Sequence, residues 1–126
     1  MSAGLASATA NAYLNVYRNT AYAAIAAVYV QLHTGDPGAA GTSNVSANTT
    51  RNQITWAAPS GGSMALSALA TYSMTTSETI THVTLWTAAS AGTFLQSGSL
   101  TTSVPVVNGS TLSFSSFTLN FQPIAA

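Results

Sequence analysis

The chain has 126 residues, of which only 3% are Asp, Glu, Lys or Arg, against roughly 25% in an ordinary soluble domain. It has no cysteine, which excludes disulfides and thiolate metal sites. Its formal net charge is zero and only two side chains are basic, which excludes the basic surface that nucleic-acid phosphates or a membrane require. Because 47% of the residues are hydrophobic, we expect one domain over residues 1–126 with a buried core.

The surface of such a chain must be covered by hydroxyl and amide side chains. With almost no charge, little electrostatic repulsion opposes association of one copy with another. Depletion of charged residues is also typical of the centres of protein interfaces. We therefore expect a protein that packs against copies of itself or a larger assembly. The alternative is a secreted domain with a Ser/Thr-rich coat.

Residues 1–27 are predicted to form an N-terminal helical segment. Apolar side chains recur at helical spacing at four positions: Leu5, Ala8, Ala12 and Val16. This spacing predicts an amphipathic helix over residues 3–18, and Thr20 can cap a second short turn that ends near residue 27. The longest apolar run, residues 21–30, is too short to cross a bilayer, so no membrane contact is expected.

Tyrosine is concentrated in and just after this helical segment. Aromatic side chains are enriched at interface hot spots, so Tyr13, Tyr17 and Tyr22 are candidate assembly contacts. The alternative is a helix packed on the rest of the domain, with the tyrosine hydroxyl groups reaching water.

From residue 28 the hydrophobic period changes to two, which predicts an antiparallel β-sandwich, jelly-roll-like or immunoglobulin-like, over residues 28–126. The expected strands are 28–33, 51–56, 64–74, 80–87, 93–96, 100–107 and a last one carrying Leu112 to Phe121. Pro105 marks an edge strand or a bulge. Asn108-Gly109 predicts a type I′ hairpin turn. The alternation of apolar side chains in the last strand slips at Ser115-Ser116. A β-bulge there would let the apolar side chains before and after the slip all face the core.

A polar loop over residues 39–50 follows the first predicted strand and the turn Gly35-Asp36-Pro37-Gly38, in which the Asp36 side chain can bond to the backbone two residues on. The loop is poor in apolar residues, which favours a mobile or partner-contacting segment. Asp36 and Arg51 flank it with opposite charges and are predicted to pair and close it. Together with Asn44 inside the loop, they complete the set of candidate assembly contacts.

Few side chains could carry chemistry. His33 and Asp36 are three residues apart, and Glu78 and His82 are four apart, so either pair could touch a divalent cation. Metal sites usually need three or four protein ligands, and the histidines are instead expected to bond locally from the less buried strand faces. No serine lies in a G-x-S-x-G motif. We expect no catalytic residue, metal or cofactor, and keep a small hydrolase as the least favoured hypothesis.

Three runs of the chain resemble a group of small virion proteins of tailed phages that infect actinobacteria. The runs are residues 29–38 (YVQLHTGDPG), 51–63 (RNQITWAAPSGGS) and 81–100 (THVTLWTAASAGTFLQSGSL). The resemblance covers about residues 28–119 and rests on turn chemistry. It implies a virion structural protein with a β-sandwich body and an N-terminal helix, placed in the head or the tail, without catalytic or ligand residues. The Tyr-rich N-terminal segment departs from the shorter, Gly-punctuated turn of that group.

The sequence therefore favours a capsid decoration or minor capsid protein, in the virion, that reinforces the outside of the head. Its expected partners are copies of itself, as a trimer or another closed ring, and the major capsid protein. The alternative is a minor tail or tail-fibre accessory protein that touches tail proteins and, through an exposed aromatic side chain, host glycans. Neither function is enzymatic, and neither involves nucleic acid.

Overall fold

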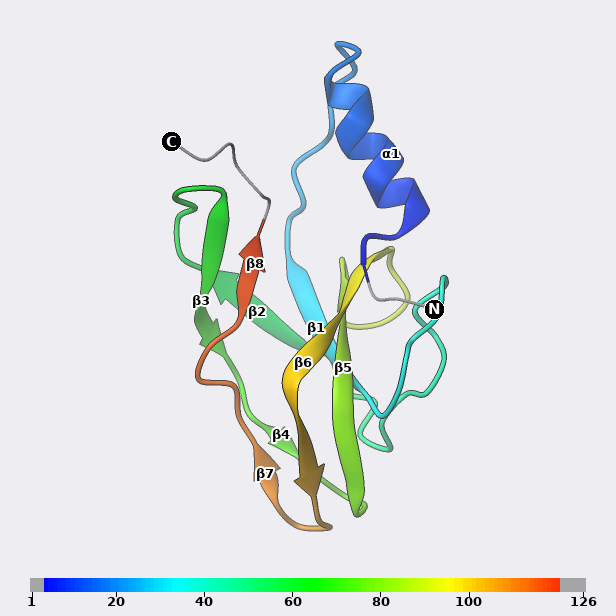
Figure 1. The fold of residues 1–126 in the computed structure, drawn as a ribbon, viewed down its shortest axis with the longest axis vertical. Helices are drawn as coiled ribbons and strands as arrows, with labels where there is room; N and C mark the ends of the chain where they lie inside the picture. The colour runs from blue at the N-terminus through cyan, green and yellow to red at the C-terminus, as the bar shows by residue number, and fades with distance from the viewer. Residues whose placement is uncertain (1–3, 121–126) are drawn as a thin grey trace.

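The structure is a computed structural model that describes residues 4–120. This part of the chain forms one helix and eight strands (Figure 1). The elements are α1 (Ser7–Val16), β1 (Val28–His33), β2 (Asn52–Trp56), β3 (Ser63–Leu69), β4 (Tyr72–Ser73), β5 (Glu78–Trp86), β6 (Phe94–Val106), β7 (Thr111–Leu112) and β8 (Thr118–Asn120). The prediction of a mainly β chain with an N-terminal helix is confirmed.

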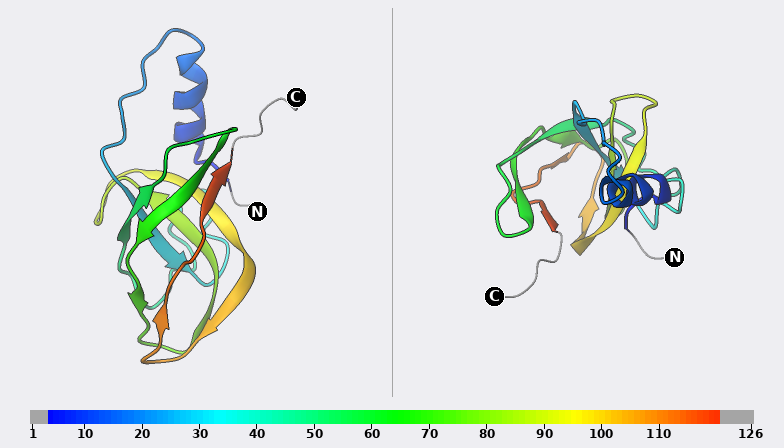
Figure 2. Two further views of the ribbon diagram at one scale, coloured as in Figure 1. Left: turned by 90° about the vertical axis from the view of Figure 1, so that its left-hand side faces the viewer. Right: turned by 90° about the horizontal axis from the view of Figure 1, so that it is seen from above.

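The strands form one large antiparallel sheet of order β6-β5-β1-β2-β3-β8 and a small two-stranded sheet of β4 and β7. The large sheet curls into a half-barrel, whose open side is visible when the molecule is turned (Figure 2). The predicted sandwich of two packed sheets is therefore not clearly formed. Sequence alternation showed which residues face inward, but the curl depends on which strands pair.

The core lies on the concave side of the half-barrel. Val30 and Leu32 of the central strand β1 and Ile80 of β5 are fully buried. Tyr72 of β4 is 1% exposed and donates its hydroxyl to the Val30 carbonyl at 2.6 Å. Leu112 of β7 joins the same cluster, so the small sheet covers part of the hollow of the large one.

The long strand predicted over residues 64–74 is in fact two strands. β3 pairs with β2 and β8, whereas β4 pairs with β7. At the break, the Asn52 side-chain amide donates to the carbonyls of Ala70 and Thr71 at 3.3 and 3.0 Å. Alternation continues across residues 70–71, so only the change of partner reveals the break. β6 shows the opposite difference, because two strands were expected where the structure has one. It lies at the edge of the large sheet, as Pro105 predicted.

The Asn108-Gly109 turn differs from the predicted type I′ hairpin. Gly109 has a φ of 89°, but Asn108 is not among the residues with positive φ, and Ser110 N donates to Val107 O at 3.0 Å. A single positive φ at the third position is the type II pattern. The flanking strands do not pair with each other, because β6 pairs with β5 and β7 pairs with β4.

The predicted bulge at Ser115-Ser116 is a crossing between sheets. The chain leaves β7 before this point and joins the large sheet again at β8. Phe114 and Phe117 flank the crossing with ring centroids 5.9 Å apart, and both pack against the core. Phe121, also expected in the core, lies outside the described residues.

Candidate assembly interface

Residues 4–27 form an N-terminal arm that projects from one end of the half-barrel (Figure 1). Helix α1 runs outward, and residues 17–27 run back to β1. At the base, Ala6 N donates to Leu95 O of β6 at 2.9 Å. Thr9, the buried residue of the helix, lies with its hydroxyl 3.4 Å from Phe94 O. The arm is thus fixed at its base to the edge strand.

The side of α1 that packs on the body is not the predicted one. Leu5 and Val16 of the predicted apolar face are 40% and 52% exposed, whereas Thr9 is 3% exposed. The helix also ends two residues earlier than predicted, and residues 20–27 form no second helical turn. The amphipathic pattern was present, but most of the helix extends past the sheet, so part of its apolar face meets solvent.

The helix ends in a well-defined cap. Asn19 has a φ of 63°, and Thr20 N donates to Asn15 O at 3.0 Å while Asn19 N donates to Val16 O at 3.2 Å. These are the two hydrogen bonds of a Schellman motif, in which asparagine tolerates the left-handed conformation better than most residues. The cap ends the helix and turns the chain back toward β1.

Two of the three candidate tyrosines lie together. The rings of Tyr13, on the helix, and Tyr22, on the returning segment, have centroids 5.3 Å apart and are inclined by 52°. Burial, and secondarily the neighbouring Tyr22, raise the pKa of Tyr13. This pair joins the two halves of the arm and is partly a structural contact.

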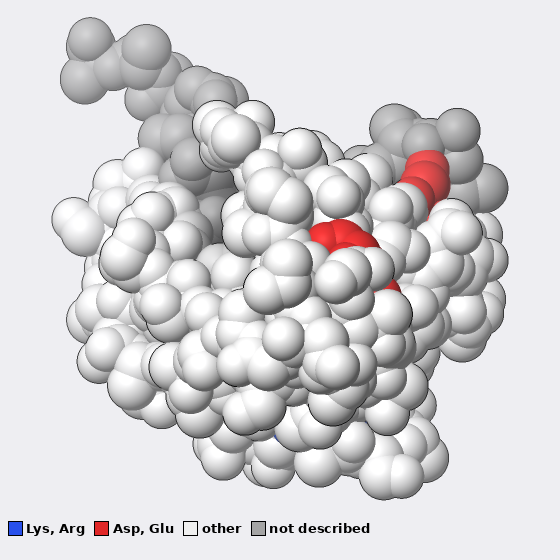
Figure 3. All heavy atoms as spheres, turned by 90° about the horizontal axis from the view of Figure 1, so that it is seen from below, with Lys and Arg blue, Asp and Glu red and all other residues white. Residues whose placement is uncertain are grey.

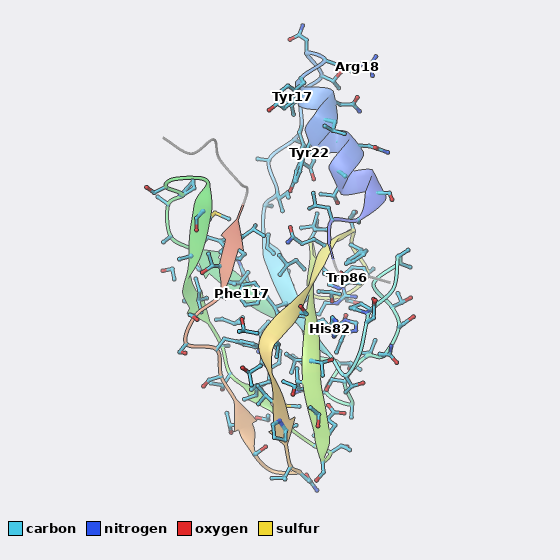
Figure 4. The ribbon with its side chains drawn as sticks, viewed as in Figure 1. Tyr17, Arg18, Tyr22, His82, Trp86 and Phe117 are labelled. Atoms are coloured by element: carbon cyan, nitrogen blue, oxygen red, sulfur yellow. The ribbon has the colours of Figure 1, made fainter. Side chains whose placement is uncertain are left out.

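The third tyrosine lies apart, at the far end of the arm (Figure 4). Tyr17 is 93% exposed, and its neighbours Leu14 and Val16 are 64% and 52% exposed. We call these three residues the arm tip. Arg18, which follows it in the chain, donates to the Asn15 side chain at 3.1 Å. Leu14 was not singled out from the sequence, because its position on the helix lies outside the expected apolar face.

Asp36 and Asn44 lie together in the loop after β1. Asp36 Oδ1 accepts from Gly38 N at 2.8 Å, the turn bond that the sequence predicts. The Asn44 amide donates to Asp36 O at 2.9 Å, and Asn44 itself has a φ of 54°. These bonds hold the first half of the loop in one shape, so the two residues have structural duties whether or not they also meet a partner.

Glu78 fastens the second half of the loop to the sheet. Its carboxylate accepts hydrogen bonds from the Ser46 hydroxyl and, at 3.2 Å, from Ala47 N. The ring of His82, four residues along β5, contacts the Thr81 hydroxyl at 2.8 Å. The pair considered as metal ligands therefore has separate local partners.

His33 is 0% exposed, so the prediction that it points from a less buried face is wrong. β1 is a central strand, and the loop folds over its second face. The ring Nδ1 lies 2.8 Å from Ser43 O and Nε2 lies 2.9 Å from Thr84 Oγ1. Since a carbonyl only accepts, Nδ1 carries the proton and Nε2 accepts from Thr84. Burial lowers the pKa of His33.

Arg51 lies against the turn between β5 and β6 and does not pair with Asp36. Its guanidinium donates to the carbonyls of Ala88 and Ala91 at 3.2 and 2.7 Å, and to Gln31 at 3.2 Å. Its central carbon lies 3.9 Å from the centre of the Trp86 ring. Planar, multiply bonded arginine of this kind holds elements together, so Arg51 is a structural residue.

A cleft of about 680 Å³ opens where the half-barrel fails to close. It lies between β6 and the segment that carries Phe117 and β8, and its floor includes Val83 and Leu85 of β5. We call it the seam cleft. Among residues 4–120, no charged residue lines it. Sequence reasoning missed the cleft because its walls come from segments far apart in the chain. The face seen from below is almost free of charged atoms apart from small Asp and Glu patches (Figure 3).

A family model described as podophage GP4 fiber I protein gp80 matches residues 4–122. The chain belongs to this family. It is thus a phage fibre protein, which implies a structural role and a place in the virion, and which favours the tail-fibre alternative over the predicted head decoration. The match spans the arm as well as every described strand. No curated protein matches the chain.

Within the described residues, little in the structure supports metal binding or sugar binding, the other activities considered from the sequence. Within residues 4–120, no group of three or more His, Asp or Glu side chains gathers in a way that could hold a metal ion. No helix in this range is long and apolar enough to cross a membrane. Trp86 is 7% exposed with its face under Arg51, and Trp56 packs against Phe117, so neither ring is an open platform for a sugar.

Proposed function

We propose that this protein is a structural subunit of a phage tail fibre that joins neighbouring subunits, copies of itself foremost, through its N-terminal arm. The observation that carries the proposal is the arm tip, where Leu14, Val16 and Tyr17 expose large side chains at the end of a projection whose charged residue, Arg18, is bonded to Asn15. Membership of a fibre family supplies the setting.

The energetics favour a shared contact over a free arm. Burying one large apolar side chain contributes about 1.5–3 kcal/mol, so three such side chains offer several kcal/mol before the entropic cost of association. A single contact of that strength is weak. A closed ring or trimer repeats it, and repetition raises the overall affinity without new contacts.

The test is sedimentation velocity of the purified chain over a wide concentration range. Wild type should form a concentration-dependent oligomer, and the double variant Leu14→Ser/Tyr17→Ser should shift it to monomer. Val107→Ser is the matched control, because Val107 is 60% exposed but directly follows β6, which ends on the side of the molecule opposite the arm (Figure 1). A wild-type chain that stays monomeric throughout, or a double variant that associates like wild type, would overturn the proposed attachment.

A second measurement distinguishes a location in the tail from a location on the head. Gold-labelled antibody against the chain, applied to intact particles, should mark the tail in few copies. Labelling spread over the head surface would instead restore the decoration reading and overturn the fibre proposal.

A further inference from the structure

We infer that the seam cleft is the receptor for the arm tip of a second copy of this chain, so that subunits join by inserting a projection into a hollow. This rests on the proposed function, since it names the surface on which the arm docks.

The seam cleft is a genuine interruption of the sheet. β6 and β8 are the two ends of the six-stranded order, and the curl brings both to the same opening. Apolar side chains provide much of the lining: Val83, Leu85, Leu100, Val104, Phe114, Phe117 and Leu119. Several of them are only half-buried, so the hollow leaves apolar surface uncovered. Covering that surface would stabilise the subunit that receives the partner.

The size of the cleft suits side chains and excludes a whole helix. Its volume of about 680 Å³ lies in the range that pockets use to enclose a compact group. An α-helix with its side chains is about 10–12 Å across and would not enter. The arm tip presents Val16 and Tyr17 next to each other at the end of the helix, with Leu14 beside them. The projection therefore matches the hollow in scale.

The absence of charge is compatible with the same occupant. In the described part of the chain, the residues that line the cleft include no Asp, Glu, Lys, Arg or His. A charged side chain placed there would lose its water without gaining a counter-ion, which is costly. The arm tip carries no charge, and Arg18 beside it is turned to Asn15. Both surfaces are thus uncharged, and the cleft offers Ser and Thr hydroxyl groups beside its apolar side chains, which suits a tyrosine with its hydroxyl.

The occupant must come from another copy. The base of each arm is held to β6 by the Ala6–Leu95 hydrogen bond, and the helix leads away from the body. In Figure 4, Tyr17 lies at the far end of the arm while Phe117 lies beside β8 on the body. A molecule cannot reach its own cleft without undoing the base. The resulting contact is heterologous, the type that closes into rings or extends along an axis.

The cysteine-free chain allows a direct test by cross-linking. Tyr17→Cys places a thiol on the arm tip, and Ser116→Cys places one in the cleft, where Ser116 is exposed. Mixed and mildly oxidised, the two variants should form a disulfide heterodimer in at least about ten-fold excess over Tyr17→Cys mixed with Asn108→Cys, a thiol at the distant turn. Equal cross-linking to both partners, or Tyr17→Cys dimerising with itself more readily, would overturn the inference.

A complementation experiment separates this inference from the proposed function. A side chain at Gly98 would point into open space, and Gly98 lines the cleft, so Gly98→Phe should fill it without disturbing the fold. Its control is Ser103→Phe, exposed on the same strand but outside the cleft lining. Circular dichroism and tryptophan fluorescence verify that each variant is folded.

We expect Gly98→Phe to weaken self-association at least about ten-fold, as Leu14→Ser/Tyr17→Ser does, and the two variants to form a one-to-one complex when mixed. The mixture succeeds because one variant keeps its cleft and the other keeps its arm. If the arm variant dissociates while Gly98→Phe associates normally, the arm attaches elsewhere and only the inference falls. If neither variant changes association, the proposed function falls with it.

Discussion

Thr84 lies at the centre of a buried chain of hydrogen bonds, and removal of its hydroxyl should destabilise the fold by several kcal/mol. Thr84 is 0% exposed. Trp86 Nε1 donates to its Oγ1 at 2.8 Å, and the same oxygen lies 2.9 Å from His33 Nε2. The His33 ring in turn donates to Ser43 O. The hydroxyl thus links β5, β1 and the loop that follows β1.

Thr84→Val keeps the shape of the side chain and removes this link. It leaves two buried groups without a partner, the Trp86 N–H and the His33 Nε2, each at a cost of about 1–3 kcal/mol. The expected loss in the free energy of unfolding is therefore roughly 2–6 kcal/mol, a large part of the 5–15 kcal/mol typical of a whole domain.

Urea titration followed by tryptophan fluorescence measures this loss. The control is Thr79→Val, an exposed position on the same strand, which should change the free energy of unfolding by less than about 0.5 kcal/mol. A Thr84→Val variant that loses less than about 1 kcal/mol would refute the assigned network.

Three further predictions follow from the same packing. Burial lowers the pKa of His33, so as the pH falls the unfolded chain binds a proton at this residue before the folded chain does. The free energy of unfolding should therefore fall as the pH drops below about 6.5. Urea titrations from pH 8 to 5 that show constant or rising stability toward acid would contradict this. Arg51→Lys should lose about 1–2 kcal/mol in urea titration, because lysine cannot reproduce the fork to the Ala88 and Ala91 carbonyls; an unchanged midpoint would contradict it. Gly41→Ala should lower the free energy of unfolding more than Gly109→Ala does, by about 1–3 kcal/mol. Both glycines have positive φ, but of the two only Gly41 has a neighbour that a Cβ would meet, the Phe94 ring at 2.7 Å. Thermal melts that show equal losses for the two variants would show that the contact with Phe94 costs nothing.

Local chemistry in the sequence predicted several local features of the fold, although not the type of the Asn108-Gly109 turn. The alternation from Val28 to His33 and the turn that follows gave β1 with its observed limits, and Pro105 indicated an edge strand. Asp36 makes the turn bond expected of it. Each of these depends on a few neighbouring residues, which is what periodicity and turn chemistry report.

Features that depend on distant partners could not be predicted. The break at residues 70–71 follows from pairing with β2 and β8 on one side and β7 on the other. The exposure of Val16 depends on where the helix lies relative to the sheet, and the burial of His33 depends on a loop that folds back over it. The seam cleft depends on the curl of six strands. None of these has a local signature.

The candidate site was predicted in part. Tyr17 was named as a contact and is among the most exposed apolar side chains of the described residues. Tyr13 and Tyr22 turned out to face each other, and Asp36, Asn44 and Arg51 all have partners within the fold. Residue type alone cannot tell an aromatic side chain that awaits a partner from one that already has a neighbour.

Locating this chain in a density map of the intact particle would test the account most directly. We predict that the subunit lies in a tail fibre, with Leu14, Val16 and Tyr17 of each copy buried against a neighbouring chain. A map that shows the chain on the head lattice, or in the fibre with the arm tip free in solvent, would contradict it.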